Sequence, residues 1–232
     1  MTFTNQIREE SKPIWDANFN HPFVRGIADG SLSLESFRYY VLQDSYYLSH
    51  FARVQAIAAS KADDLFTTSR LAAHAQGTYE AELGLHESFI KQLRVTDDEI
   101  ASFMPSPTAY AYTSHLYRVA AAGNLGEIIA ALLPCYWIYY EIGRLLKGKA
   151  PEEPIYQEWI NAYGGEWFAT LVNEQIVRLD QLAKQSTAEE RHKMKQHFII
   201  SSQYEFLFWD MAYNLENWPI EQEELLETGA ER

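Results

Sequence analysis

The sequence predicts an all-α protein that folds as one domain, a helical bundle over residues 1–232. Apolar residues recur at three- and four-residue spacing, which is the period of an amphipathic helix, and the alternating β-branched segments typical of strands are absent. Helix start signals are frequent, and the connections between helices are short and carry no linker or repeat. A chain of this length can bury a sizeable core without disulfides or metals.

Start signals place the individual helices. Ser33 precedes a long apolar pattern, and Ser106 is an N-cap candidate followed by proline at the first helical position. The segments Asn124–Glu127 and Thr187–Glu190 have the spacing of a capping box. A short segment is expected after Pro219. The predicted helices span residues 4–19, 34–60, 64–92, 107–122, 125–147, 153–162, 165–185 and 188–215.

The longest apolar run, Ile128–Tyr140, predicts a central helix rather than a membrane span. Its 13 residues would rise only about 20 Å as a helix, short of the ~30 Å hydrocarbon core of a bilayer. Glu127 and Glu141 bracket the run, and a helix that is apolar on every side is expected to be wrapped by other helices. Pro134 removes a backbone donor, which predicts a kink immediately before Cys135.

Charge and cysteine content limit the function classes. The net charge is −13 and no basic stripe is present, so we expect no nucleic-acid partner. The acidity suits a neutral or cationic small ligand, although solubility explains it as well. Cys135 is the only cysteine, which suits a reducing compartment, and residues 1–12 lack the apolar core of a signal peptide. We therefore expect a cytoplasmic protein with no membrane partner.

Two side chains near the apolar helices are candidates for chemistry. Cys135 and Tyr139 are an i,i+4 pair, so the sulfur and the phenol can line one cavity, although a buried cysteine alone is more often structural. Glu205 shares its helix face with Phe208 and Trp209. A carboxyl group among aromatic rings favours its protonated form and can serve a leaving group. The alternative is that Glu205 points outward or pairs with an arginine.

Asp44 stands where the apolar pattern of its helix expects a hydrophobic residue. Its two oxygens would match a ligand amino group beside a ring nitrogen; a structural ion pair with an arginine is the alternative. Tyr163 precedes two glycines that stop a helix, which predicts a ring at a flexible corner. Aromatic rings from four separate segments would form a slot for a flat heterocycle, together with the thiol and the two carboxyl groups. These rings belong to Tyr47, Tyr112, Tyr139 and Tyr163.

Four segments together resemble the TenA (thiaminase II) family, in its cysteine-bearing branch. They lie in order and at the expected separations, so the resemblance covers essentially the whole chain. The segments are Leu42–Leu48 (LQDSYYL), Leu133–Tyr139 (LPCYWIY), Tyr163–Trp167 (YGGEW) and Tyr204–Met211 (YEFLFWDM).

The resemblance implies a haem-oxygenase-like fold, a homotetramer and an enzyme without a metal or other cofactor. It implies hydrolysis of 4-amino-5-aminomethyl-2-methylpyrimidine to the hydroxymethylpyrimidine and ammonia, and cleavage of thiamin to the same pyrimidine and the thiazole.

Family likeness also implies the roles of the candidate residues. Cys135 would be the nucleophile that adds to the ring, and Glu205 the proton donor. Asp44 would bind the aminopyrimidine edge. The likeness assigns ring contact to Tyr139 and Tyr163, and support of the sulfur to Tyr47 and Tyr112.

Two other functions remain open at this point. The same fold houses haem and di-iron proteins, but Glu82 and His86 are one residue too far apart for a Glu-x-x-His step. His21 could hold haem, although a lone histidine is more often at the surface. A non-catalytic protein that senses aminopyrimidines would keep the pocket and would not need Cys135 or Glu205.

Overall fold

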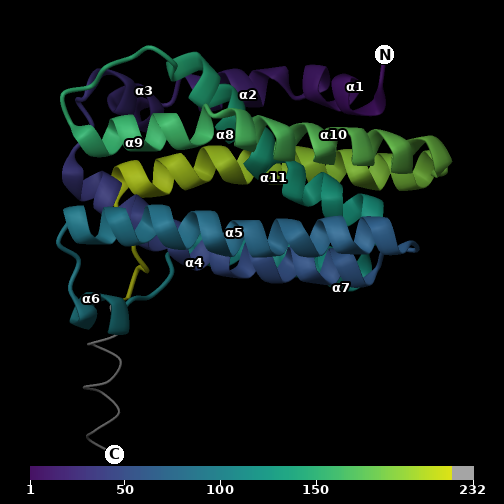
Figure 1. Cartoon of the computed structure of the whole chain (residues 1–232), viewed down its shortest axis with the longest axis horizontal. Helices are drawn as coiled ribbons and strands as arrows, with labels where there is room; N and C mark the ends of the chain where they lie inside the picture. Colours follow the sequence, from purple (N-terminus) through teal and green to yellow (C-terminus); the bar gives the residue numbers. More distant parts are fainter. Residues whose placement is uncertain (221–232) are drawn as a thin grey trace, which may run out of the picture.

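The computed structural model describes residues 1–220, apart from the side chains of residues 81–83, and this part of the chain is helical without strands (Figure 1). The all-α prediction is confirmed. The helices are α1 (Phe3–Glu10), α2 (Lys12–Phe19), α3 (Pro22–Asp29), α4 (Leu34–Ser60), α5 (Leu65–Gln92), α6 (Asp97–Ala101), α7 (Pro107–Ala122), α8 (Leu125–Leu146), α9 (Pro154–Tyr163), α10 (Glu166–Gln185) and α11 (Ala188–Asn214).

Most predicted boundaries agree with the structure to within one residue, and the differences are short helices. The segment 4–19 is two helices, because the chain breaks at Ser11 and proline opens α2. The helices α3 and α6 were not predicted; each is too short to show a clear apolar period. The segment expected after Pro219 lies mostly outside the described residues.

The predicted caps form largely as expected. The side chains of Ser33 and Ser106 accept hydrogen bonds from backbone amides in the first turns of α4 and α7. Thr187 forms a complete capping box. Asn124 forms half of one: it accepts from the amide of Glu127, but the Glu127 carboxylate lies 3.3 Å from His197 Nε2 instead of returning to the cap. These local bonds fix where the long helices begin.

Helix α8 lies at the centre of the bundle, in contact with α4, α7, α9, α10 and α11. It continues unbroken through Pro134. Among the described residues, α8 is the one helix that is long and apolar enough to cross a membrane. The apolar run alone was too short for a span, but the whole helix is not. However, 72% of its most apolar window is buried inside the protein, as expected of a core helix.

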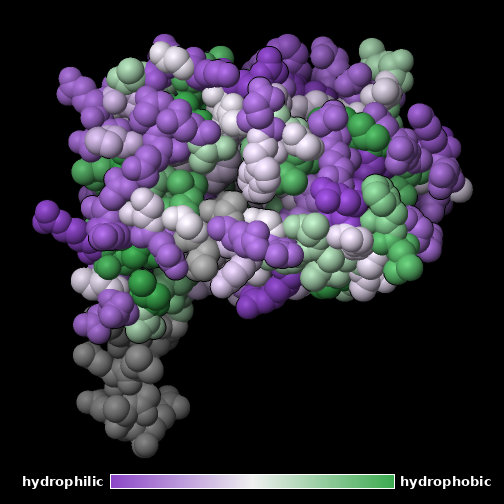
Figure 2. Space-filling model, viewed as in Figure 1, coloured by the Kyte–Doolittle hydropathy of each residue, from purple (hydrophilic) through white to green (hydrophobic). Residues whose placement is uncertain are grey.

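The long helices α4 and α5 lie side by side, and α8, α10 and α11 lie above them in Figure 1. One hydrophobic core joins residues from the two groups of helices. The visible surface is mainly hydrophilic, interrupted by smaller apolar areas (Figure 2). Exposed apolar side chains at the start of α5 include Leu65 and Phe66.

Close backbone packing joins α8 to the end of α9. A Cβ atom at Gly143 would lie 2.5 Å from the backbone nitrogen of Gly164, so the two glycines allow an approach that a side chain would prevent. This contact brings Tyr163, the last residue of α9, against α8.

Candidate active site

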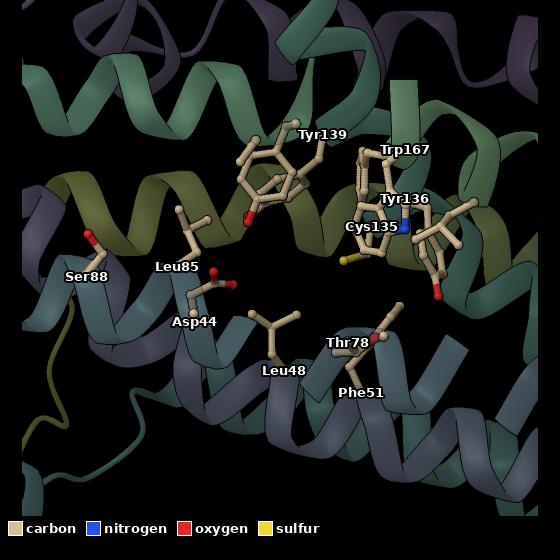
Figure 3. A pocket seen from close by; sticks show the side chains of 16 residues that line it. Asp44, Leu48, Phe51, Thr78, Leu85, Ser88, Cys135, Tyr136, Tyr139 and Trp167 are labelled. Carbon is tan, nitrogen blue, oxygen red and sulfur yellow. The ribbon is translucent and has the colours of Figure 1, made fainter. Parts of the chain in front are cut away.

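A cavity of about 400 Å³ lies between the α4–α5 pair and the helices α8, α9 and α10. Its walls are mainly apolar and aromatic, with few polar groups, which is usual for a small-molecule site. Figure 3 shows Asp44 and Tyr139 towards one end and Phe51, Thr78 and Trp167 towards the other, with Cys135 between them.

The thiol of Cys135 lies on α8 and reaches the cavity while remaining partly buried. Tyr139, one helical turn further along, lines the same cavity. The sequence therefore placed the sulfur and this phenol in one cavity correctly. A half-buried thiol open to a pocket can meet a ligand, unlike one packed fully in a core.

Asp44 is buried, 3% exposed, and also lines the cavity. Its Oδ2 atom lies 3.3 Å from Nε2 of His86 on α5. The partner is thus a histidine, and the alternative of an arginine ion pair is wrong. A carboxylate held at the wall of an apolar cavity can bind an amino group through strong, charge-assisted hydrogen bonds.

Glu205 on α11 is only 2% exposed, so the alternative in which it points outward is wrong. Tyr112 donates a hydrogen bond of 2.5 Å to its Oε1 atom. The pKa of Glu205 is raised to about 8: burial is the main cause, the Tyr112 hydrogen bond opposes it, and the charge of Asp44 adds to it. The group therefore holds a proton near neutral pH. Glu205 does not line the cavity and lies behind its wall.

Tyr47 and Tyr112 are buried behind the same wall, with ring centroids 4.8 Å apart. The Tyr47 hydroxyl makes no hydrogen bond of ordinary geometry to a described residue. Burial raises its pKa well above the usual value, and the neighbouring Cys135 sulfur, when ionised, raises it further. Tyr112 is fixed by its bond to Glu205 and by stacking on Tyr204, with centroids 4.9 Å apart.

Tyr163 does not lie at a flexible corner, as its glycines suggested. It is 7% exposed, and its ring packs edge-on against Tyr139 with centroids 4.8 Å apart. Gly164, the first of these glycines, serves the close contact with Gly143 on α8. The hydroxyl of Tyr40 donates to that of Tyr139 at 3.3 Å, which helps to fix the cavity wall.

Several residues in or beside the cavity were not predicted from the sequence. His86 was considered only as a metal ligand, and Tyr136 was not singled out although it follows Cys135. The Tyr136 hydroxyl is held by Gln55 and by His74 Nδ1, the latter at 3.0 Å. The available signal was a pair of glycines inside α5, since Gly77 and Gly84 both line the cavity. Further unpredicted wall residues are Leu48, Phe51, Thr78, Leu85, Ser88, Ala162, Trp167, Phe168 and Leu171.

The candidate residues for haem or iron do not form a metal centre in the described part of the chain, where no cluster of three or more His, Cys, Asp or Glu side chains could hold an ion. His21 is buried, contrary to the expectation of a surface residue. Its Nδ1 atom accepts from the amide of Phe23 at 3.1 Å and caps α3. The Glu82 side chain lies outside the described residues.

The family model described as TENA/THI-4/PQQC matches residues 8–215. The chain belongs to this family. It is 54% identical to a protein named aminopyrimidine aminohydrolase from Bacillus subtilis (strain 168), over 100% of this chain and 99% of the relative. It is also similar to a solved TenA homologue from P. horikoshii OT3, with 32% identity, a TM-score of 0.83, and coverage of 92% of this chain and 99% of the other.

The haem-oxygenase-like fold is confirmed as well. A domain of this fold from Shewanella denitrificans os217 covers 97% of this chain and 95% of its own, with a TM-score of 0.72 and 18% identity. At that identity the likeness describes the fold alone. Membership of the TENA/THI-4/PQQC family rests on the family model and on the whole-length relative.

Proposed function

We propose that this protein is a hydrolase that cleaves a C–N bond of an aminopyrimidine, in thiamin salvage. The substrate is 4-amino-5-aminomethyl-2-methylpyrimidine, and the products are the 5-hydroxymethyl compound and ammonia. One structural observation carries the proposal: a partly buried thiol and a buried carboxylate share a cavity, and a carboxyl group that keeps its proton lies behind the wall. The name of the whole-length relative supports the same reaction.

The proposed mechanism begins with covalent attack by Cys135. Its thiolate adds to the pyrimidine ring, and the ring loses its aromaticity. The electron pair then expels the amine from the neighbouring exocyclic CH₂, and Glu205 gives that amine a proton. Water adds to the exocyclic carbon and returns a proton to Glu205. The thiolate then leaves, and aromaticity is restored.

Each remaining group has a defined task in this proposal. Asp44 binds the amino edge of the ring, while Tyr139 and Tyr163 contact the ring itself. Tyr47 supports the thiolate through the hydroxyl that lacks a partner, and Tyr112 orients Glu205. Because Glu205 lies behind the cavity wall, we infer that its side chain turns towards the cavity when substrate is bound. Catalytic hydrogen bonds often tighten only in such complexes.

Thiamin is proposed as a second substrate. The part of the cavity away from Asp44 is lined by aromatic residues, including Phe51 and Trp167 (Figure 3). This part lies beyond the thiol as seen from Asp44, and we propose that the larger leaving group extends into it. An aromatic wall of this kind suits the thiazolium cation of thiamin.

Ammonia release from the aminomethylpyrimidine tests the proposal directly. Cys135→Ser should lose nearly all hydrolysis and still bind the hydroxymethyl product, as measured by titration calorimetry. Glu205→Gln should slow the chemical step more than it weakens binding. Normal turnover by the serine variant would exclude covalent catalysis. Binding without turnover by the wild-type protein would instead indicate a non-catalytic sensor of aminopyrimidines.

We also propose a homotetramer in the cytoplasm. Apolar side chains on α11, among them Ile200 and Leu207, are exposed in the single chain, and an interface would bury them. The lone cysteine suits a reducing compartment. Analytical ultracentrifugation tests the assembly, and fractionation of cells tests the location.

A further inference from the structure

His86 belongs to the binding site although it does not line the cavity. It is buried, 6% exposed, on the face of α5 that packs against α4. Its Nε2 atom lies 3.3 Å from Oδ2 of Asp44, and its Nδ1 atom lies 2.5 Å from Oγ of Ser45. The imidazole ring thus connects two consecutive residues of α4.

The hydrogen bonds of Ser45 determine what the ring can do. Ser45 Oγ also lies 3.0 Å from the carbonyl oxygen of Val41, to which only the hydroxyl proton can be given. If Ser45 donates to Val41, it accepts from Nδ1–H of the ring. If Ser45 donates to Nδ1, the neutral ring carries its proton on Nε2. In the second arrangement, and in a ring protonated on both nitrogens, Nε2–H faces Oδ2 of Asp44 at 3.3 Å, a contact that lacks the geometry of a regular hydrogen bond.

The contact with His86 also selects one oxygen of the carboxylate. Oδ2 of Asp44 is the oxygen that is completely buried and that faces His86. A carboxylate that rotated freely about its last bond would present its oxygens to a ligand in varying directions. Fixing Oδ2 leaves Oδ1 in a constant direction, which is what recognition of a planar amino edge requires.

We propose that His86 is a positioning residue, which holds the Asp44 carboxylate in a fixed rotation for binding the amino edge of the ring. Ser45 supports the ring from the other side. The inference rests on the proposed function, because it concerns how the same site selects an aminopyrimidine.

Three substitutions separate this role from simple packing. His86→Gln keeps a donor near the position of Nε2, His86→Asn keeps one only near Nδ1, and His86→Leu keeps none. Glu87→Gln, at the exposed neighbouring position on α5, is the matched control. For each variant, kcat and KM are measured with the aminomethylpyrimidine and with its analogue that lacks the 4-amino group, and the midpoint of thermal unfolding is recorded.

His86→Leu and His86→Asn should raise KM for the amino substrate about tenfold, because the carboxylate of Asp44 loses the polar group that faces its Oδ2 atom, with kcat changed less than about threefold. Discrimination against the analogue should fall by a similar factor. His86→Gln should keep KM and discrimination close to the wild-type values, and Glu87→Gln should match the wild type.

Two patterns would overturn the role of His86 alone. One is wild-type KM and discrimination in the leucine variant. The other is equal loss in all three variants, with lowered unfolding midpoints, which would indicate packing. If the wild-type protein neither hydrolyses the substrate nor binds the hydroxymethylpyrimidine in calorimetry, the proposed function fails first, and this inference fails with it.

Discussion

Replacing Glu205 by glutamine should stabilise the protein in a way that depends on pH. Glutamine keeps the shape of the side chain and an oxygen that accepts from Tyr112, but it cannot ionise. In the wild type, burial raises the pKa of Glu205 from an ordinary 4.5 to about 8. Between these values the folded chain holds a proton that the unfolded chain releases.

The sign and size of the stability change follow from the difference between the folded and unfolded pKa of Glu205. In that window the unfolded state binds fewer protons than the folded state, so the free energy of unfolding falls by about 1.4 kcal/mol for each pH unit of increase. The contribution is intact below the unfolded pKa and is lost progressively as the pH rises towards 8. From about pH 5.5 to about pH 8 the advantage of Glu205→Gln over wild type should therefore grow by about 3 kcal/mol.

Urea unfolding followed by circular dichroism, at one fixed protein concentration, measures this gap at each pH. Glu9→Gln makes the same chemical change at an exposed position and should alter stability by less than about 0.5 kcal/mol throughout. An advantage of Glu205→Gln that stays constant from pH 5.5 to pH 8 would refute the assignment of a proton to buried Glu205.

Three further substitutions test other contacts of the site. Tyr112→Phe removes the 2.5 Å hydrogen bond that lowers the pKa of Glu205. The basic limb of the pH–rate profile should therefore move up by about one unit; a downward shift would contradict this. Tyr47→Phe removes a buried hydroxyl that lacks a partner, so kcat should fall about tenfold while unfolding stability is unchanged or improved, as urea titration would show. Gly143→Ala places a methyl group 2.5 Å from Gly164, and calorimetric unfolding should show a loss of about 1–3 kcal/mol.

Local signals explain what the sequence could predict about this fold. Caps such as Ser33 and Thr187 lie within three residues of the amides or carboxylates that they bind, so the starts of the long helices were predictable. Asp44 and Glu205 could be recognised because a charge interrupts an apolar helix face. Their burial is the cause of that pattern.

Contacts between distant segments explain what could not be predicted. The pairing of Asp44 with His86 depends on how α4 packs against α5, and no spacing in the sequence encodes it. Tyr163 was assigned to a flexible corner because its glycines were interpreted locally. The partner of Gly164 is Gly143, which lies on another helix, and only the packed structure shows that this glycine allows a close contact.

The electrostatic coupling between Asp44 and Glu205 has a consequence for ligand affinity. The negative charge of Asp44 is one of the causes that raise the pKa of Glu205. A cation that settles beside Asp44 offsets this charge, so the proton on Glu205 becomes easier to release. Uptake of a cationic guest would then expel a fraction of a proton into the solvent at mildly alkaline pH, and its affinity would vary with pH even if the guest itself never titrates.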